Sequence, residues 1–278
     1  MLLTRTLSAL VLAPIAVAAI LLGGWILIGL LAIGLGLAAW EYVRLMRQGG
    51  YQPVWWVALI LIVVLLIDPA QSATLPTSAE LSATLTRLAP AVVSLVLLGS
   101  LTWHLGHRSA TVTADWALAV AGGIYLGWAG RQFVQIRAFD NGAAWLLLVL
   151  AGVWLADTGA YLIGVRWGRH KMTPALSPKK SWEGLMGGSA AGLIGNGLLA
   201  AVLGLPAIHG VALGLLGATI GTLGDLAISM IKRQVGAKDS GQLIPGHGGA
   251  LDRVDSLLFA VIAGQLYLVW IAGLPAAS

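Results

Sequence analysis

The stretch GLMGGSAAGLIGNGLLAAVLGLPAIHGVALGLLGATIGTLG, residues 184–224, decides the fold of this chain. It contains no charged side chain, and it is about twice as long as the roughly 20 mostly apolar residues that a helix needs to span a bilayer. The stretch must therefore fold back on itself, and the glycines and proline of GLPAIHG, residues 204–210, supply a turn. We predict two membrane-spanning helices, near residues 185–203 and 209–231.

The rest of the chain has the same character. Of its 278 residues, 58% are hydrophobic and 10% are charged, whereas a water-soluble domain has about 25% charged residues. The mean hydropathy is +0.89. The sequence therefore predicts an all-α polytopic integral membrane protein. We expect nine spans, near residues 7–22, 25–43, 54–67, 88–105, 115–130, 143–162, 185–203, 209–231 and 256–273.

The first predicted span has a second interpretation. It carries one arginine, Arg5, a short apolar run and the triplet AVA, residues 16–18, which together resemble a cleavable signal peptide. Because the next span follows after only Gly23 and Gly24, we favour an uncleaved helical hairpin.

The distribution of basic residues predicts the orientation, since loops rich in Lys and Arg stay in the cytoplasm. With a cytoplasmic N-terminus, nine spans place all but three of the 16 Lys and Arg residues inside, the exceptions being Arg87, Arg131 and Arg137. We therefore expect a protein of the inner (cytoplasmic) membrane with its C-terminus outside and its active site facing the cytoplasm. The net charge of +5 then reflects topology and attraction to anionic lipids, so we expect no nucleic-acid partner.

Charged residues gather in two cytoplasmic segments, residues 164–184 and 232–255. We accordingly divide the chain into an N-terminal region of four spans, residues 1–110, and a catalytic membrane region, residues 111–278. The chain has no cysteine, which excludes disulfides, thiol catalysis and cysteine-ligated metals.

Asp157 and Asp225 are carboxylates within predicted spans, where an ionised side chain costs at least about 2.5 kcal/mol. Asp157 and Asp225 both stand near the cytoplasmic ends of their helices. Asp225 follows Gly221 by four residues and so shares the face of a glycine stripe, which packs against another helix. Ser229 and Lys232 continue that face. A salt bridge or an interfacial position is the alternative explanation, more so for Asp157.

The segment 232–255 combines cations, glycines and acids. The cations are Lys232, Arg233 and Lys238, and the glycines of IPGHGG, residues 244–249, can turn backbone N–H groups toward an anion. Asp252 and Asp255 flank Arg253. This set suits a polyphosphate with Mg²⁺, a hard cation that prefers carboxylate and phosphate oxygens. Asp225 and Asp252 are the predicted magnesium ligands, with Asp255 in reserve.

Less specific explanations stay open for several of these residues. A charge run is usually a solvated face, and His247 can satisfy loop backbone instead of touching a phosphate or a metal. In the segment 164–184, Lys179 and Lys180 can bind phosphate groups or simply follow the positive-inside rule.

The C-terminal segment resembles a known signature. From Ser229 to Asp255 the chain matches SxxKRx4KDxGx2[LIF]PxHGGxxDRxD, the signature of phosphatidate cytidylyltransferases, also called CDP-diacylglycerol synthases. The stretches DTGAYLIG, residues 157–164, and SPKKSWEG, residues 177–184, resemble two further parts of that family. The chain departs from the pattern at Ala250, where a larger aliphatic residue is usual, and at Ser181, where threonine is usual.

The resemblance implies transfer of a cytidylyl group from CTP to phosphatidic acid, with CDP-diacylglycerol and pyrophosphate as products. It implies Mg²⁺, and a second, monovalent cation as an open alternative. Membrane lipids are the other expected partners, and stripes of small residues suggest a homodimer. The implied magnesium ligands are Asp225 and Asp252. The implied catalytic residues are Lys232, Arg233, Lys238, Asp239, Arg253 and Asp255. The implied substrate contacts are Asp157, Lys179, Lys180, Ser229, His247, Gly248 and Gly249.

Two alternatives remain at this point. Another membrane enzyme that uses CTP, such as a polyprenol kinase or an ether-lipid cytidylyltransferase, would differ only in its lipid pocket. An ion-coupled transporter or channel would place Asp157 and Asp225 on an ion path. The sequence shows no inverted repeat of the kind that favours a transporter.

Overall fold

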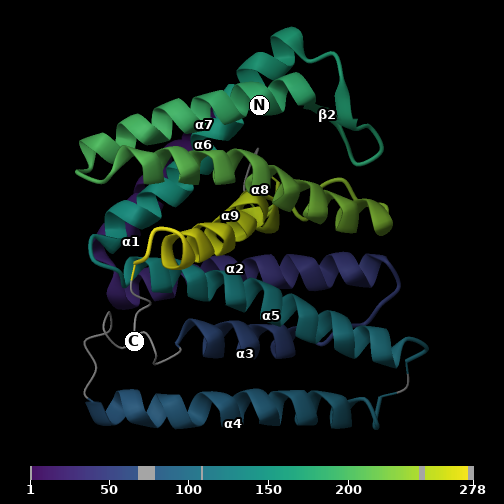
Figure 1. The fold of residues 1–278 in the computed structure, drawn as a ribbon. Coiled ribbons are helices and arrows are strands. Elements are labelled where there is room, and N and C mark those ends of the chain that lie inside the picture. Colours follow the sequence, from purple (N-terminus) through teal and green to yellow (C-terminus); the bar gives the residue numbers. More distant parts are fainter. Residues whose placement is uncertain (1, 68–78, 108, 244–247, 275–278) are drawn as a thin grey trace. The chain divides into compact units, whose positions relative to one another are not determined.

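A computed structural model describes residues 2–67, 79–107, 109–243 and 248–274, and most of these are helical (Figure 1). The helices are α1 (Leu2–Leu22), α2 (Gly24–Gln48), α3 (Trp55–Leu66), α4 (Ala79–Trp103), α5 (Val112–Arg137), α6 (Gly142–Trp167), α7 (Trp182–Val202), α8 (Ala207–Gln234) and α9 (Leu251–Trp270). Two strands, β1 (Lys171–Thr173) and β2 (Ser177–Ser181), form an antiparallel hairpin.

Among the described residues, six helical segments are long and apolar enough to cross a membrane, which confirms a helical, multi-pass membrane protein. They are α2, residues 83–103 of α4, α6, α7, α8 and α9. The third predicted span is an apolar helix of only 12 residues, α3, and the fifth, α5, is not among the six. Nine spans and the sidedness of the termini stay predictions.

Two of the predicted helix boundaries match the structure closely. Gly23, with a φ of 66°, separates α1 from α2, which begins at Gly24 with a φ of 52°. Residues 203–206 separate α7 from α8, so the predicted turn at residues 204–210 overlaps the observed one and the first residues of α8. Positive φ suits glycine, which has no Cβ to clash. The chain therefore folds back where the sequence places its breaks.

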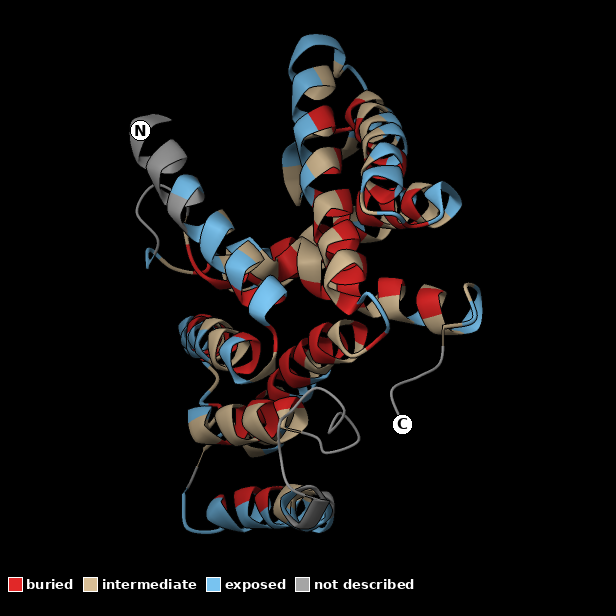
Figure 2. Ribbon diagram, turned by 90° about the vertical axis from the view of Figure 1, so that its left-hand side faces the viewer, coloured by how far each residue is buried: buried red, intermediate tan, exposed pale blue. Residues whose placement is uncertain are grey.

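The chain forms two compact units. The first contains residues 1–138 and 234–253. Its core lies where α5 meets α3 without intervening side chains: a Cβ on Gly123 would lie 2.8 Å from the Cα of Ala58, and one on Gly127 would lie 3.0 Å from the Cα of Ile62. Most residues of these two helices are buried or partly buried, whereas the described residues of α1 are mostly exposed (Figure 2). Exposed apolar side chains on a membrane helix are those that lipid can cover.

The second unit contains residues 139–233 and 254–276. Its helices pack through the predicted glycine stripe of α8. A Cβ on Gly210 would meet Ala200 of α7 at 2.5 Å, one on Gly217 would meet the Gly152 carbonyl carbon of α6 at 2.6 Å, and one on Gly224 would meet the Asp255 carbonyl oxygen of α9 at 2.6 Å. The stripe is therefore internal packing and does not supply the exposed surface from which a homodimer was expected.

The hairpin corrects the all-α prediction. Helix α6 continues through Trp167 and ends at Gly168, and the remainder of the predicted loop 164–184 contains both strands. The strands pair Lys171 with Ser181 and Thr173 with Ser177. The strands have three and five residues, and their burial does not alternate, so the sequence offers no clear period-two signal for them. The division of the chain at residue 110 stays a prediction, while the compact units divide after residue 138.

Candidate functional site

An ion pair joins the hairpin to α8. The ammonium nitrogen of Lys180 on β2 lies 2.7 Å from Oδ2 of Asp225, and the two side chains are 22% and 32% exposed. The same ammonium donates to the Thr222 carbonyl oxygen at 3.2 Å, and the Ser229 hydroxyl donates to Asp225 Oδ1 at 3.2 Å. The prediction that Ser229 shares the face of Asp225 is confirmed. The segment 164–184 thus meets the glycine-striped face of α8 at one carboxylate, that of Asp225.

The hairpin is held at its base, next to the start of α7. The Ser181 hydroxyl caps α7 by accepting from the Gly184 N–H at 3.1 Å. The Glu183 carboxylate accepts from the N–H groups of Arg169 and His170, both at 3.1 Å, and contacts His170 Nδ1 at 2.5 Å. Because both ends of the hairpin are tied to α7, Lys180 is presented to Asp225 from a fixed support.

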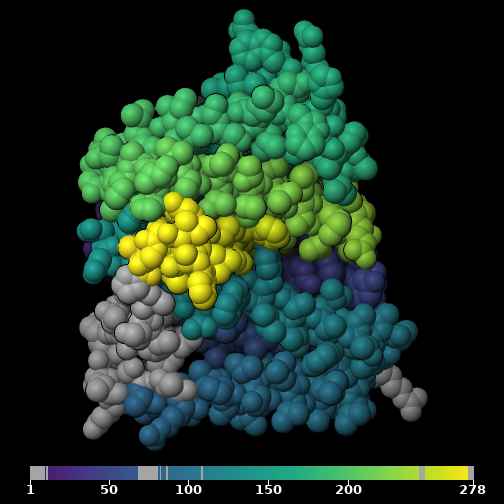
Figure 3. All heavy atoms as spheres, in the orientation of Figure 1, coloured from purple at the N-terminus to yellow at the C-terminus, as the bar shows by residue number. Residues whose placement is uncertain are grey.

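Lys179, the other predicted phosphate contact on β2, is exposed. The hairpin segment projects at the upper edge of the second unit in the space-filling view (Figure 3). Lys180 was expected to bind phosphate, and the structure gives it a carboxylate partner of the protein itself. Phosphate binding by Lys179 and Lys180 stays a prediction.

Helix α9 crosses α8 next to Asp225. Gly224 lies against the Asp255 carbonyl oxygen and the Phe259 side chain, so the acidic start of α9 approaches α8 at this glycine. Asp255 is 7% exposed, and its Oδ1 accepts from the Ser256 N–H at 2.7 Å. Lys232, in the last turn of α8, is equally buried. Both residues are buried charged groups, which are usually paired or functional.

In the first unit, three donors converge on Asp252. Its Oδ2 accepts from the Ser240 N–H at 2.8 Å, the Ser240 hydroxyl at 2.9 Å and the Gly249 N–H at 3.1 Å. Gly248 has a φ of 81°, the backbone conformation that turns this loop. From the sequence we expected the Gly249 N–H to bind the anion of a substrate. In the structure it donates to the Asp252 carboxylate.

Helix α9 begins at Leu251, five residues before the predicted span. Asp252 therefore lies in the first turn of a helix, where the N–H groups and the helix dipole favour a negative charge, and Asp255 follows in the next turn. Lys238, Asp239 and Arg253 are exposed, as is Arg233 at the end of α8. His247 lies outside the described residues.

Sequence reasoning missed Glu41. This residue of α2 is fully buried and accepts from the Ser240 hydroxyl at 2.8 Å and from the Leu251 N–H at 2.9 Å. The available signal was an acidic residue, between Trp40 and Tyr42, at the end of a long uncharged stretch. Because the predicted span ends at residue 43, a charged residue at position 41 could be explained by the membrane interface alone, without a buried contact.

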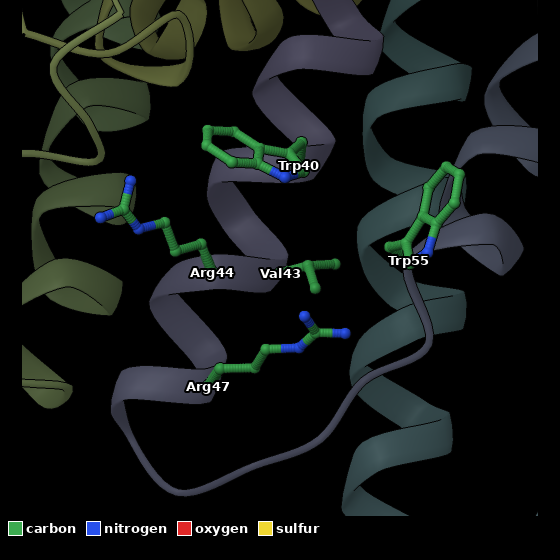
Figure 4. Close-up of a pocket in the computed structure, with 5 residues that line it drawn as sticks. All are labelled: Trp40, Val43, Arg44, Arg47 and Trp55. Carbon is green, nitrogen blue, oxygen red and sulfur yellow. The ribbon is translucent and has the colours of Figure 1, made fainter.

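A cavity of about 440 Å³ opens at the end of α2, lined by Trp40, Val43, Arg44, Arg47 and Trp55. Figure 4 shows Arg47 extending toward Trp55, while the guanidinium of Arg44 points the other way and lies 5.7 Å from the centre of the Trp40 ring. Indoles beside guanidinium groups are typical of helix ends at a membrane interface. The cavity therefore fits the predicted position of this end of α2.

The carboxylate and hydroxyl oxygens around Asp225 and Asp252 are hard donors of the kind that Mg²⁺ prefers. Among the residues that the structure describes, no three Asp, Glu or His side chains gather into one group. Asp225 belongs to the second unit and Asp252 to the first, so a shared magnesium ion stays a prediction. Asp157 is exposed on α6, and its contact with substrate also stays a prediction.

Comparison with known proteins gives a match over almost the whole chain. Residues 3–271 match the model of the cytidylyltransferase family. A phosphatidate cytidylyltransferase of Synechocystis sp. is 33% identical, with 92% of each chain covered. That of Brucella suis is 43% identical over 53% of this chain and 55% of its own length. That of Mycobacterium bovis is 41% identical over 46% of this chain and 42% of its own length.

The chain thus spans only about half the length of the Brucella and Mycobacterium relatives in these matches. The family model nevertheless extends from α1 to the last turn of α9. The chain belongs to the cytidylyltransferase family.

Proposed function

We propose that the protein transfers the cytidylyl group of CTP to phosphatidic acid, giving CDP-diacylglycerol and pyrophosphate. The observation that carries the proposal is the Lys180–Asp225 pair, because it unites the hairpin and α8 at a carboxylate within a membrane helix. The family match and the names of the relatives support the same reaction. They do not favour the transporter or the other enzymes considered above.

In this reaction a phosphate oxygen of phosphatidic acid attacks the α-phosphorus of CTP, and the bond to the β-phosphate breaks. The second pKa of a phosphate monoester is about 6, so the attacking group is already largely ionised at pH 7 and needs no side-chain base. The protein then has to position the two phosphates and neutralise charge, which are the dominant contributions in phosphoryl transfer.

The residues divide between these two tasks. Asp225 and Asp252 would hold Mg²⁺, which when bound neutralises phosphate charge. Lys232, Arg233 and Lys238 would stabilise the departing pyrophosphate, and Asp239, Arg253 and Asp255 would orient these cations. The lipid phosphate or the nucleotide would be drawn in by Lys179 and Lys180.

The remaining parts of the proposal concern the surroundings of the site. We place it at the cytoplasmic face of the inner membrane, in agreement with the distribution of Lys and Arg. Asp157, Ser229, His247, Gly248 and Gly249 would contact substrate. A homodimer and a monovalent cation remain part of the proposal, and the dimer would need a surface other than the α8 glycine stripe.

The test is a product assay in detergent with purified protein, Mg²⁺ and CTP labelled in the cytosine ring. With phosphatidic acid as acceptor we expect labelled CDP-diacylglycerol and an equal amount of pyrophosphate. Parallel reactions contain a polyprenol or an archaeal-type ether lipid phosphate. Product with the polyprenol alone, or release of CDP instead of pyrophosphate, would refute the assignment.

A further inference from the structure

Glu41 connects α2 to the segment 240–251 within the first unit. It is 0% exposed, and its Oε2 accepts two hydrogen bonds: one from the Ser240 hydroxyl at 2.8 Å and one from the Leu251 N–H at 2.9 Å. These partners are 199 and 210 residues away in the sequence. One carboxylate oxygen of α2 therefore fixes both ends of a segment that contains the Gly248–Gly249 turn.

The glycines of that segment fit around the same carboxylate. A Cβ on Gly241 would come within 2.8 Å of Glu41 Cδ, and one on Gly249 would come within 2.6 Å of the same atom. Cβ atoms do not approach other heavy atoms so closely, so the Glu41 carboxylate fills space that any side chain at these two positions would need. Contact with the Glu41 carboxylate therefore explains why positions 241 and 249 are occupied by glycine.

The segment held by Glu41 is also the one that holds Asp252. Asp252 Oδ2 takes its two backbone donors from Ser240 and Gly249, and the Ser240 hydroxyl lies between Glu41 Oε2 and Asp252 Oδ2, at 2.8 and 2.9 Å. A hydroxyl has one hydrogen to donate. The two backbone N–H groups therefore hold Asp252 even when the hydroxyl donates to Glu41, and their position depends on the segment that Glu41 anchors.

A buried polar side chain in a membrane helix has a high desolvation cost and is usually kept for function. For Glu41 the cost is increased because, among the described residues, its other oxygen Oε1 has no hydrogen-bond partner. A role in stability alone is better served by an apolar residue at this position of α2. The hydrogen bonds of Glu41 to Ser240 and Leu251 indicate that its role is to position Asp252.

We propose that Glu41 is a positioning residue for the cytidylyl transfer: it acts as a double hydrogen-bond acceptor that fixes Ser240 and Leu251, and through them the orientation of Asp252. This role rests on the proposed function, in which Asp252 binds the magnesium ion. Glu41 needs only an acceptor oxygen at the Oε2 position, so a glutamine, whose amide oxygen can accept both bonds, retains the role.

The test compares three full-length variants in detergent. Glu41→Leu removes the acceptor, Glu41→Gln keeps it without the charge, and Leu35→Ala, at another buried position of α2, serves as the packing control. We measure amide hydrogen exchange of residues 239–251 by mass spectrometry, the rate of trypsin cleavage after the exposed Lys238, and the dependence of turnover on Mg²⁺ concentration.

For Glu41→Leu we expect faster exchange and faster cleavage in this segment, and about a 10- to 100-fold loss of magnesium affinity or activity, the usual effect of removing a group that orients a ligand. Glu41→Gln should stay within about threefold of the parent in every measurement. Complete loss of the positioning role would instead lower magnesium affinity or activity by about 10-fold or more. Leu35→Ala should lower the unfolding temperature and leave exchange of residues 239–251 unchanged.

Two results would overturn the inference. Normal exchange and normal Mg²⁺ dependence in Glu41→Leu would show that Asp252 is placed without Glu41. A loss in Glu41→Gln as large as in Glu41→Leu would show that the charge matters and not the acceptor. Exchange that responds as expected in a protein that forms no CDP-diacylglycerol would refute the proposed function alone, because exchange does not depend on turnover.

Discussion

Lys180 and Asp225 form a half-buried ion pair across 2.7 Å, although they are separated by 45 positions in the sequence and lie on a strand and a helix, respectively. The strand is the second of a hairpin that is tied to the start of α7. Lys180 thus has a defined carboxylate partner, Asp225. The effect of losing this pair can be distinguished from the effect of lowering the positive charge of the segment.

Replacement of Lys180 by methionine should impair activity far more than stability. Ion pairs with this degree of exposure contribute about 1 kcal/mol or less to folding, whereas loss of a group that orients a metal ligand typically costs about 10- to 100-fold in activity. We expect that loss in kcat/KM with a nearly unchanged unfolding temperature. Lys171→Met, which removes an exposed lysine of the opposite strand, is the control for charge and should retain activity.

Replacement of Asp225 or Asp252 by asparagine tests the proposed magnesium ligands. Each change keeps the shape and removes the negative charge, so we expect turnover to fall by about 100-fold or more, as for loss of a charge-stabilising catalytic group. The half-saturating Mg²⁺ concentration should rise in both variants. Near-normal turnover and Mg²⁺ dependence in either one would remove that residue from the site.

Replacement of Gly217 by alanine should destabilise the second unit. The added methyl carbon would lie 2.6 Å from the Gly152 carbonyl carbon and 2.8 Å from the Val153 nitrogen, both of which are backbone atoms that cannot rotate away. Overpacking of this kind costs about 1–3 kcal/mol, which should appear as a lower unfolding temperature in detergent. Gly34→Ala is the matched change: nothing lies within 4 Å of its added carbon, so stability should hold or increase.

Replacement of Ser181 tests the support of the hairpin. Ser181→Ala removes the cap of α7 and should cost about 1 kcal/mol, with a loss of activity because Lys180 is its neighbour. Ser181→Thr keeps the hydroxyl that accepts from Gly184 and should behave like the parent. Equal losses in both variants would mean that space around Gly168, whose added Cβ would meet the Ser181 hydroxyl oxygen at 2.6 Å, matters more than the cap.

The sequence predicts those features that depend on helical periodicity. Asp225, Ser229 and the glycines of α8 recur at helical spacing, so their common face could be assigned, and the contacts with α6, α7 and α9 confirm it. The fold-back points are equally local, because they depend on glycine and proline. The membrane character follows from composition alone.

Contacts between distant parts of the chain could not be predicted. Glu41 meets Ser240 across 199 residues, and no spacing in a single sequence encodes such a pairing. The hairpin was not predicted for another reason. Its basic residues were explained by the positive-inside rule, which indicates a cytoplasmic loop and gives no information on secondary structure. The early start of α9 was missed because the apolar run begins only after Asp255, although the acidic residues before it suit a helix N-terminus.

The first unit takes its residues from two separate parts of the sequence, 1–138 and 234–253. During synthesis the chain emerges from its N-terminus onward, and contacts of high sequence separation form late. Ser240 and Leu251, the two hydrogen-bond partners of Glu41, are therefore made only after α6, α7 and α8. A nascent chain that stops before residue 240 would therefore leave the Glu41 carboxylate without either of these two hydrogen-bond donors.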